Sequence, residues 1–228
     1  MNKHVTCIVA AGGSGKRMGA SINKLFLEID EIPIIAYTLS ALEDCENVNE
    51  IIISAREEDI VFLSKLVEKF AISKVKTIVK GGATRGESVL CASKELSPDT
   101  DFVMVHDAAR PLVTNEIIER TLKATVSFGA AACGVKPKCT LKSVDSDVIV
   151  DTIDREKTIE IQTPQIFSKE LFLKMYDFDT ETIKNATDDC VLAEKTGASI
   201  HITEGSYKNI KITTPEDIKM AEIFLRRY

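Results

Sequence analysis

Residues Ala10 to Lys24 read AAGGSGKRMGASINK and directly follow a short apolar run, Val5–Val9. An apolar run that is rich in β-branched residues and ends at glycines predicts a buried strand. Four glycines and three cations then occur within fifteen residues, a composition suited to placing backbone N–H groups and positive side chains around phosphates. The stretch therefore predicts a phosphate-binding loop after a strand, with a turn bearing solvated cations as the alternative.

Spacing distinguishes this loop from two common phosphate loops. The dinucleotide fingerprint requires a glycine where the chain has Met18, and the P-loop requires a glycine at Ala10 and a hydroxyl at Arg17. Neither pattern is present. The distinguishing side chains are instead Arg17 and Lys24, which predict a loop that closes over a polyphosphate.

Composition excludes several classes of protein. The chain has 228 residues, of which 44% are hydrophobic and 28% charged, and a net charge of −6, which argues against a general nucleic-acid binder. There is no apolar stretch of transmembrane length and no signal-peptide pattern, so we expect a cytoplasmic protein that does not bind membranes. The six cysteines contain no C-x-x-C pair, which indicates reduced thiols.

Short apolar runs alternate with amphipathic segments along the chain. This alternation predicts an α/β fold, a Rossmann-like, mostly parallel sheet with helices on both faces. In such sheets ligands bind at the carboxyl ends of the strands. The expected strands are 5–9, 50–55, 75–79, 101–106 and 199–203, and the expected helices are 33–42, 57–70, 87–96, 115–129, 168–176, 188–197 and 214–225.

The segment at about 136–160 has a different character, with a hairpin-like alternation of apolar and polar residues. We expect a single domain over 1–228 from which this segment protrudes as a β-arm. Because two-fold pairing is the commonest assembly of soluble proteins, the arm predicts a homodimer; an arm folded back on its own domain is the alternative.

The loops at the strand ends combine several cations with one acidic residue. The residues are Arg17, Lys24, Arg85, Asp107, Arg110 and Lys211. Asp107 is suited to Mg²⁺, which prefers oxygen ligands shared with substrate phosphates, although it is also a possible helix cap. This mixture predicts phosphoryl chemistry, which depends on positioning and charge neutralisation.

Three further polar residues can be interpreted from their positions in the sequence. We interpret His106 as a packed residue at a strand end rather than a catalytic base. Ser88 either contacts a base or sugar or caps the helix that it begins, and Thr187, with Asp188 and Asp189, is most simply a capping motif.

Five motifs in this order resemble those of the 2-C-methyl-D-erythritol 4-phosphate cytidylyltransferase family. They are Ala10–Gly19, Gly81–Arg85 with Ser88-Val89, Val105–Pro111, Gln162–Gln165 and Asn209–Thr213. The resemblance covers essentially the whole chain. It implies a fold of the nucleotide-diphospho-sugar transferase type, Mg²⁺ dependence, dimerisation through the arm, and cytidylyl transfer from CTP to a polyol phosphate with release of pyrophosphate.

The resemblance also implies roles for individual residues. Arg17, Lys24 and Lys211 would be catalytic, and Asp107 would bind both substrate and metal. Thr140 and Arg155 in the arm would meet the methylerythritol phosphate across the dimer. The remaining residues expected to bind nucleotide or substrate are Ala10, Ala11, Gly12, Gly13, Gly15, Gly82, Ser88, Arg110, Thr163 and Thr187.

The chain departs from the family pattern at a few positions. Asn23 and Leu25 flank Lys24 where the family usually has Pro and Gln, Ala83 stands where an acidic residue is common, and Lys208 precedes Asn209 where related enzymes often place a second metal carboxylate. A ribitol 5-phosphate cytidylyltransferase and a non-catalytic nucleotide-binding module are the alternative functions.

Overall fold

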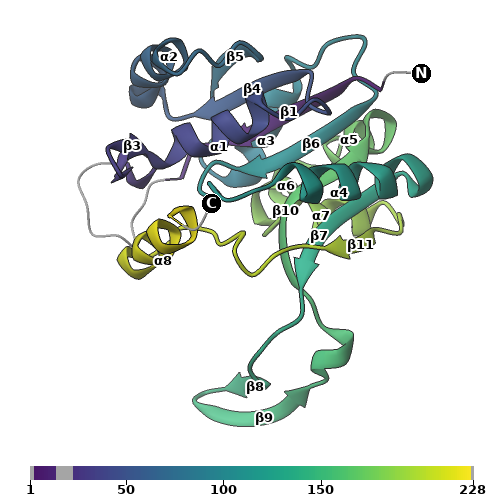
Figure 1. Ribbon diagram of the computed structural model, residues 1–228. Helices are drawn as coiled ribbons and strands as arrows, with labels where there is room; N and C mark the ends of the chain where they lie inside the picture. The colour runs from purple at the N-terminus through teal and green to yellow at the C-terminus, as the bar shows by residue number, and fades with distance from the viewer. Residues whose placement is uncertain (1–2, 14–22, 227–228) are drawn as a thin grey trace.

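The computed structural model describes residues 3–13 and 23–226 (Figure 1). Its elements are, in chain order, β1 (Val5–Ala10), η2 (Lys24–Phe26), β2 (Glu28–Ile29), β3 (Ile32–Pro33), α1 (Ile34–Glu43), β4 (Glu50–Ala55), η3 (Glu57–Asp59), α2 (Ile60–Lys69), β5 (Val75–Lys80), α3 (Arg85–Ser93), β6 (Phe102–Asp107), α4 (Asn115–Phe128), β7 (Ala130–Val135), β8 (Leu141–Asp145), β9 (Val148–Ile153), η4 (Arg155–Lys157), β10 (Glu160–Ser168), α5 (Lys169–Met175), α6 (Thr180–Asn185), α7 (Asp189–Lys195), β11 (His201–Glu204) and α8 (Pro215–Leu225).

A central sheet organises the described part of the chain. Its seven strands have the order β11-β7-β10-β6-β1-β4-β5. β1 pairs in parallel with β4 and β6, and among the seven described strands of this sheet only β10 runs antiparallel to its neighbours. The chain runs outward from β1 to β5 and then returns to the other side of β1 at β6. The carboxyl ends of β1 and β6 are therefore the switch point at which open α/β sheets bind ligands.

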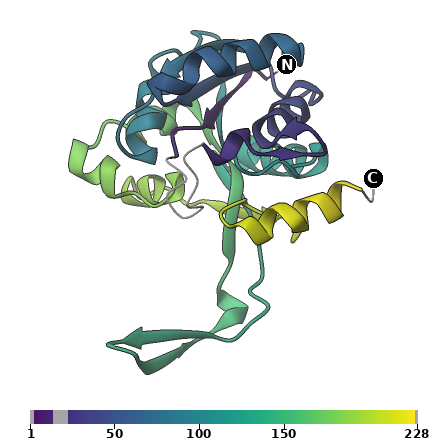
Figure 2. The ribbon, with the colours of Figure 1, turned by 90° about the vertical axis from the view of Figure 1, so that its left-hand side faces the viewer.

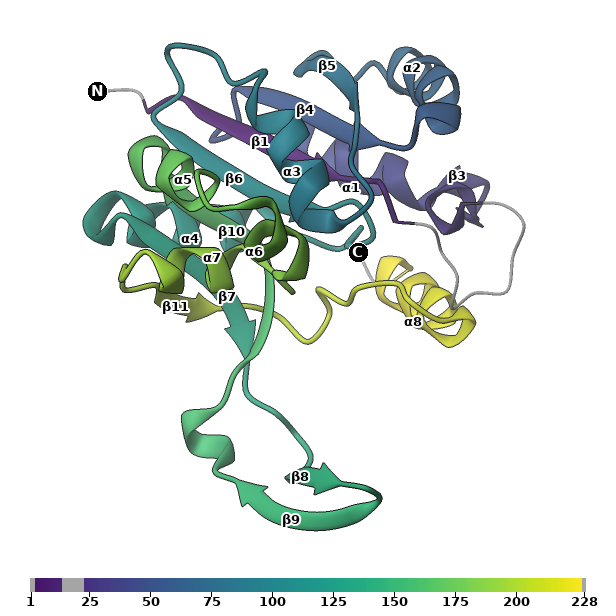
Figure 3. The same ribbon diagram turned by 180° about the vertical axis from the view of Figure 1, so that it is seen from behind.

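Helices cover both faces of the sheet (Figures 1 and 3). α1, α2 and α4 contribute to one apolar cluster, which also contains Val5, Cys7 and Val9 of β1. α3, α5, α6 and α7 contribute to a second cluster with Ile8, which points the other way. A strand that is buried on both faces has an almost continuous apolar sequence. The structure thus confirms the predicted fold class.

β8 and β9 form a separate two-stranded antiparallel sheet. This hairpin lies away from the main sheet and is joined to it through β7 and β10 (Figure 2). Its side chains are largely exposed, including Val148, Ile149 and Val150. The alternation in this segment therefore does correspond to a hairpin, while its role in dimerisation stays a prediction.

Helix ends follow local sequence signals, with small shifts from the expected positions. α3 begins at Arg85 because Thr84 and Glu87 form a capping box. Thr114, rather than Asn115, is the cap position of α4, which ends as predicted at Gly129 in the left-handed conformation, with φ 87°. α8 begins as predicted, with Pro215 following the cap Thr214.

The sequence patterns did not predict β7, α6 or the antiparallel β10. β10 contains Pro164, which interrupts a strand pattern because it has no N–H for the ladder. The structure accommodates this proline where the register with β7 shifts, between Ile161 and Gln165. Within the described residues, no helix is long and apolar enough to cross a membrane.

Candidate active site

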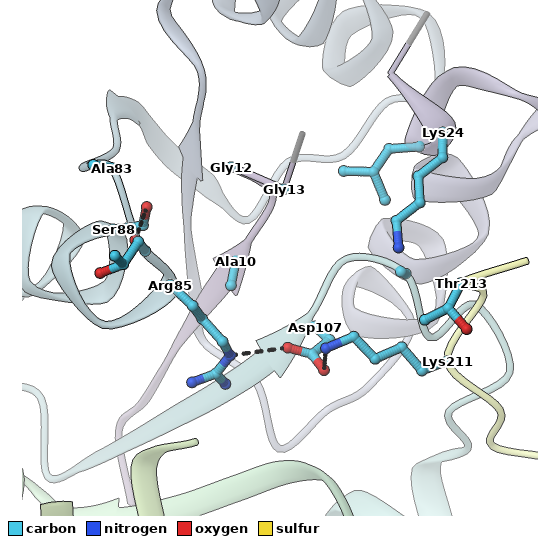
Figure 4. Close-up of a pocket in the computed structure, with 13 residues that line it drawn as sticks. Ala10, Gly12, Gly13, Lys24, Ala83, Arg85, Ser88, Asp107, Lys211 and Thr213 are labelled. Carbon is cyan, nitrogen blue, oxygen red and sulfur yellow. Dashed lines mark hydrogen bonds and ion pairs between the residues drawn. The ribbon is translucent and has the colours of Figure 1, made fainter. Parts of the chain in front are cut away.

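A pocket of about 370 Å³ opens at the carboxyl ends of β1 and β6 (Figure 4). It brings together the loop after β1, η2, the start of α3, the end of β6 and the segment before α8. The residues that line it are Ala10, Gly12, Gly13, Lys24, Leu25, Ala83, Thr84, Arg85, Ser88, Asp107, Ala109, Lys211 and Thr213. Segments far apart in sequence therefore meet where the fold predicts a ligand.

The carboxylate of Asp107 is the centre of a cluster of cations. Its Oδ2 lies 2.7 Å from Nζ of Lys211 and 3.7 Å from Nε of Arg110, and its Oδ1 lies 3.2 Å from Nε of Arg85. Burial alone would raise the pKa of Asp107, but Arg85, Lys211 and Arg110 outweigh it and hold that pKa far below its ordinary value. Asp107 is therefore ionised, and the helix-cap interpretation is wrong because the residue ends β6.

A second buried carboxylate holds Arg85 from the opposite side. Nη1 of Arg85 lies 2.7 Å from Oδ2 of Asp189, and the Tyr176 hydroxyl donates a hydrogen bond of 2.5 Å to Oδ1 of Asp189. Burial opposes the charge of Arg85, yet Asp189 and Asp107 keep its pKa above the ordinary value. Arg85 thus presents a fixed positive charge to the pocket.

Asp189 pairs with Arg85, and Tyr176 pairs with Asp189, which are contacts that the sequence patterns did not predict. Only Asp188 is needed as the cap of α7, where its side chain accepts from the N–H of Val191. Asp189 is fully buried although it follows directly. The second of two acidic residues at one helix start, unused for capping, is the signal from which this site could have been found.

Lys24 approaches the pocket from η2, on a different element from Lys211. Its Nζ donates to the carbonyl of Ile212 at 2.7 Å, and the N–H of Ile212 donates to the carbonyl of Ala109 at 2.8 Å. Asp217 accepts hydrogen bonds from Thr213, which fastens the same segment to the start of α8. The two lysines are thus held on neighbouring segments of one pocket, as the sequence predicts.

The glycine-rich segments surround Ser88. The hydroxyl of Ser88 donates to the carbonyl of Thr84 at 2.8 Å, so Ser88 lies within α3 and does not cap it. A Cβ at Gly12 would lie 3.1 Å from Oγ of Ser88, and one at Gly81 would lie 2.7 Å from it. Because these positions are glycines, the backbone approaches Ser88 closely. Gly12 and Ser88 together form part of one wall of the pocket.

Several predicted binding residues lie beneath the pocket rather than on its lining. Arg110 is buried, and its Nη1 donates to the carbonyl of Asn209 at 2.7 Å. The hydroxyl of Thr163 accepts from the N–H of Asp107 at 3.1 Å and lies 3.1 Å from Nδ1 of His106. Arg110 and Thr163 therefore support Asp107 in this structure.

His106 is fully buried. Its Nε2 lies 3.3 Å from the carbonyl of Arg110 and must donate to it, so the contacts fit a neutral ring whose Nδ1 accepts from Thr163. Burial lowers the pKa of His106 to about 4. These facts support the interpretation as a packed residue, because His106 does not line the pocket.

The other predicted residues lie outside the pocket lining. Ala11 is buried in the core, and Gly82 lies beside the lining residue Ala83. Thr140, Arg155 and Thr187 are exposed, the first two next to the hairpin strands and the third before α7. Arg17 and Gly15 lie outside the described residues.

The donor set around Asp107 does not fit a resident metal ion. Among the residues that the structure describes, no three His, Cys, Asp or Glu side chains gather to hold a metal. Asp107 already has Arg85 and Lys211 at both oxygens. The geometry favours a carboxylate that orients cations, while the metal role predicted for Asp107 stays untested.

Comparisons with known proteins show which family the chain resembles over its length. A profile of the 2-C-methyl-D-erythritol 4-phosphate cytidylyltransferase family matches residues 5–227. A protein of that name from Bacillus cereus is 43% identical over 220 residues, covering 96% of this chain and 97% of its own length. One from Clostridium botulinum is 43% identical over 228 residues, covering 100% of this chain and 99% of its own length.

Solved structures show the same likeness. The crystal structure of a 4-diphosphocytidyl-2C-methyl-D-erythritol synthase from Anaerococcus prevotii superposes with a TM-score of 0.84 at 30% identity and covers 100% of both chains. A 2-C-methyl-D-erythritol 4-phosphate cytidylyltransferase from Francisella tularensis gives a TM-score of 0.82 at 27% identity, covering 97% of this chain and 99% of its own. The chain belongs to the 2-C-methyl-D-erythritol 4-phosphate cytidylyltransferase family.

Proposed function

We propose that this protein is an enzyme that transfers the cytidylyl group of CTP to 2-C-methyl-D-erythritol 4-phosphate. The products are 4-diphosphocytidyl-2-C-methyl-D-erythritol and pyrophosphate. The observation that carries the proposal is the pocket that Lys24, Lys211 and Arg85 line, in which Lys211 and Arg85 pair with a single ionised carboxylate, Asp107. Family membership identifies the pair of substrates.

The chemistry follows from the charges of this pocket. A phosphate oxygen of the polyol phosphate attacks the α-phosphorus of CTP in line, a new P–O bond forms, and the bond to the β-phosphate breaks with its electron pair leaving on pyrophosphate. The attacking oxygen is already anionic, so no general base is needed, in keeping with a neutral, buried His106. The enzyme's task is to bring two anions together and to stabilise the charge that develops.

We assign this stabilisation to Lys24 and Lys211, whose ammonium groups line the pocket. Arg17, assigned through the family resemblance, would act on the same triphosphate. Asp107 orients Lys211 and Arg85 toward the reacting phosphates. Each of these roles requires positive charge fixed before the transition state forms, which is the arrangement that electrostatic catalysis favours.

The nucleoside would lie against the wall formed by the first glycine-rich loop and the start of α3. Backbone groups of Ala10, Ala11, Gly12 and Gly13 would approach the nucleotide closely, with Gly15 following. Ser88 and Gly82 would frame the cytidine, because the close backbone approach around Ser88 leaves room for a flat base.

We propose that magnesium enters as part of the nucleotide substrate. Mg²⁺ commonly keeps substrate phosphates and water as ligands and needs one or two carboxylates at most. Asp107 is the acidic side chain that lines the pocket in the described part of the chain. Asp107 would hold the ion together with the substrate phosphates, and the ion would help to neutralise the charge of those phosphates.

The hairpin would complete the site through a homodimer. Thr140 and Arg155 lie outside the pocket of their own chain, so a role in binding methylerythritol phosphate requires the pocket of a second copy. Thr163, Arg110 and Thr187 would support or contact the same substrate. Val148, Ile149 and Val150 are 64%, 62% and 61% exposed, and apolar patches of this kind favour association.

A pyrophosphate-release assay with CTP, Mg²⁺ and each polyol phosphate tests the activity. We expect release with 2-C-methyl-D-erythritol 4-phosphate. Release with ribitol 5-phosphate alone would identify the alternative enzyme, and no release with either would favour a non-catalytic module. Lys24→Ala should lower kcat by roughly 10²–10³-fold, and a change confined to KM would contradict its role in the transition state.

Sedimentation tests the dimer separately. Ile149→Asp should shift a dimer toward monomer, because it places a charge in the apolar patch of the hairpin. Val61→Asp is the matched control, since Val61 is 66% exposed on α2 and lies outside the hairpin. We also propose that the protein is located in the cytoplasm.

A further inference from the structure

Asn23, the residue before Lys24, is held by hydrogen bonds in three directions. It is buried, with 4% of its surface exposed. Its side-chain oxygen accepts from the N–H of Leu25 at 3.1 Å, and its carbonyl accepts from the N–H of Phe26 at 2.9 Å. Asn23 therefore caps and closes the short helical turn η2 that carries Lys24.

The amide nitrogen of Asn23 fixes this turn to a different element. Nδ2 of Asn23 donates to Oδ2 of Asp59 at 2.8 Å. Arg56 contacts both oxygens of the same carboxylate, with Nε 2.7 Å from Oδ2 and Nη2 3.0 Å from Oδ1. A bidentate arginine–carboxylate pair has a defined geometry, so the acceptor for Asn23 is itself held in place.

Asp59 has no capping function that would explain its burial. It occupies the cap position of α2, yet its side chain makes no capping hydrogen bond there. The residue is nevertheless only 5% exposed, which is unusual for a carboxylate unless its oxygens are paired. The pairs that it makes are with Arg56 and with Asn23 across to η2.

The side-chain ammonium group of Lys24 is also held in place. Its Nζ donates to the carbonyl of Ile212, in the segment between Lys211 and Thr213. The backbone of Lys24 is thus fixed through Asn23, and its ammonium group is held at the carbonyl of Ile212, the residue that follows Lys211. Placement of a catalytic charge to within about 1 Å has large effects on rate.

We propose that the Asn23–Asp59–Arg56 network is a positioning device for Lys24, so that three residues outside the pocket lining set the rate of cytidylyl transfer. Asn23, Asp59 and Arg56 are positioning residues because they act through Lys24. This inference rests on the proposed function, since it assigns new residues to the same reaction.

The experiment measures kcat and KM for CTP in wild type, Asn23→Ala, Asp59→Ala, Lys24→Ala and the double variant Asp59→Ala/Lys24→Ala. We expect Asn23→Ala and Asp59→Ala to lower kcat by roughly 10-fold or more with a smaller change in KM. In the Lys24→Ala background, Asp59→Ala should change kcat by less than about 2-fold, because the group that it positions is absent.

Two further variants separate positioning from folding. Asn23 has φ −58°, which proline also adopts, but proline cannot donate to Asp59, so the kcat of Asn23→Pro should stay as low as that of Asn23→Ala. Glu58→Ala is the matched control, since Glu58 forms the other ion pair of Arg56, at 3.2 Å, and is itself exposed. Thermal unfolding of each variant checks that it is folded.

The outcomes are distinct. Wild type without pyrophosphate release would overturn the proposed function and this inference with it. An active wild type in which Lys24→Ala is impaired but Asn23→Ala and Asp59→Ala keep the wild-type kcat would overturn the inference alone. An equal loss from Asp59→Ala with and without Lys24 would also overturn it, because the effect would then not pass through the lysine.

Discussion

Nζ of Lys211 lies 2.7 Å from Oδ2 of Asp107, which joins the segment before α8 to the end of β6. Asp107 also faces Arg85 and Arg110, so one carboxylate neutralises charge on three cations. Since the group is buried, removing its charge takes away the carboxylate that Lys211 and Arg110 contact and leaves Arg85 paired with Asp189 alone. The site is therefore a place where stability and activity depend on the same side chain.

Asp107→Asn keeps the shape of the side chain and removes its charge. We expect the free energy of unfolding to fall by about 3 kcal/mol and kcat/KM to fall by roughly 100-fold, measured by urea unfolding and by pyrophosphate release. Asp177→Asn, at an exposed position, should change the free energy of unfolding by less than about 0.5 kcal/mol. Equal stabilities of the two variants would contradict the central role of Asp107.

Acidification should weaken the fold through His106. Its pKa is lowered to about 4 from the model-compound value of 6.5, so between these values the unfolded chain binds a proton that the folded chain does not. Stability from the neutral ring is complete above pH 6.5 and is lost as the pH falls toward 4. Between pH 7.5 and 5 this loss amounts to about 2 kcal/mol.

Urea unfolding at pH 7.5 and pH 5 checks this prediction in wild type and His106→Asn. The variant keeps an acceptor toward Thr163 but cannot titrate, so its free energy of unfolding should fall less than that of wild type over the same interval. The comparison cancels the contributions of all other groups, which both proteins share. The same fall in both proteins would show that His106 is not the group responsible.

The sequence predicted the scaffold well where physical signals are local. β1, β4, β5 and β6 are short apolar runs between turns, and the helix starts at Ser168, Asp188 and Thr214 carry their own caps. β10 was missed because Pro164 breaks the local pattern, and its pairing with β6 and β7 depends on residues distant in the chain. Local patterns do not contain that information.

The residues of the site likewise fall into two groups, those that the sequence predicted and those that it did not. Lys24, Asp107 and Lys211 were predicted because cations and one acid follow strands at the same edge of the sheet, and the structure brings them together. Asp189 and the Asn23–Asp59 contact were not predicted, since each joins segments far apart in sequence. Asn23 was only visible as a departure from the family pattern, and its hydrogen bonds give it a structural meaning.

Tyr176 should contribute to stability through the carboxylate of Asp189. Burial and the neighbouring Asp189 hold the pKa of Tyr176 well above its ordinary value, so its hydroxyl remains a donor at neutral pH. Tyr176→Phe leaves a buried carboxylate oxygen without this donor and should lower the free energy of unfolding by about 1–3 kcal/mol.

Tyr207→Phe provides the matched control for Tyr176→Phe. Tyr207 donates from its hydroxyl to the carbonyl of Lys136 at 2.8 Å, but its side chain is 45% exposed. Water replaces the lost partner there, and the change in stability should stay within about 0.5 kcal/mol. Chemical denaturation of both variants gives the comparison, and similar losses would mean that burial of Asp189 is not what makes the Tyr176 hydrogen bond important.

Gly12 and Ser88 should be energetically coupled in nucleotide binding. A Cβ at Gly12 would lie 3.1 Å from Oγ of Ser88 and 3.9 Å from its Cβ, and these are the contacts within 4 Å among the described residues beyond its chain neighbours. Gly12→Ala therefore forces Ser88 or the loop to move. We expect KM for CTP to rise roughly 10-fold, which is the size of effect that overpacking of about 1–2 kcal/mol produces.

Ser88→Ala removes the oxygen responsible for the contact with a methyl group at position 12. In the Ser88→Ala background, Gly12→Ala should thus raise KM by less than about 3-fold, a coupling that a double-mutant cycle measures. Additive effects would show that the methyl group meets the nucleotide rather than Ser88, and that the glycine is required by the ligand itself.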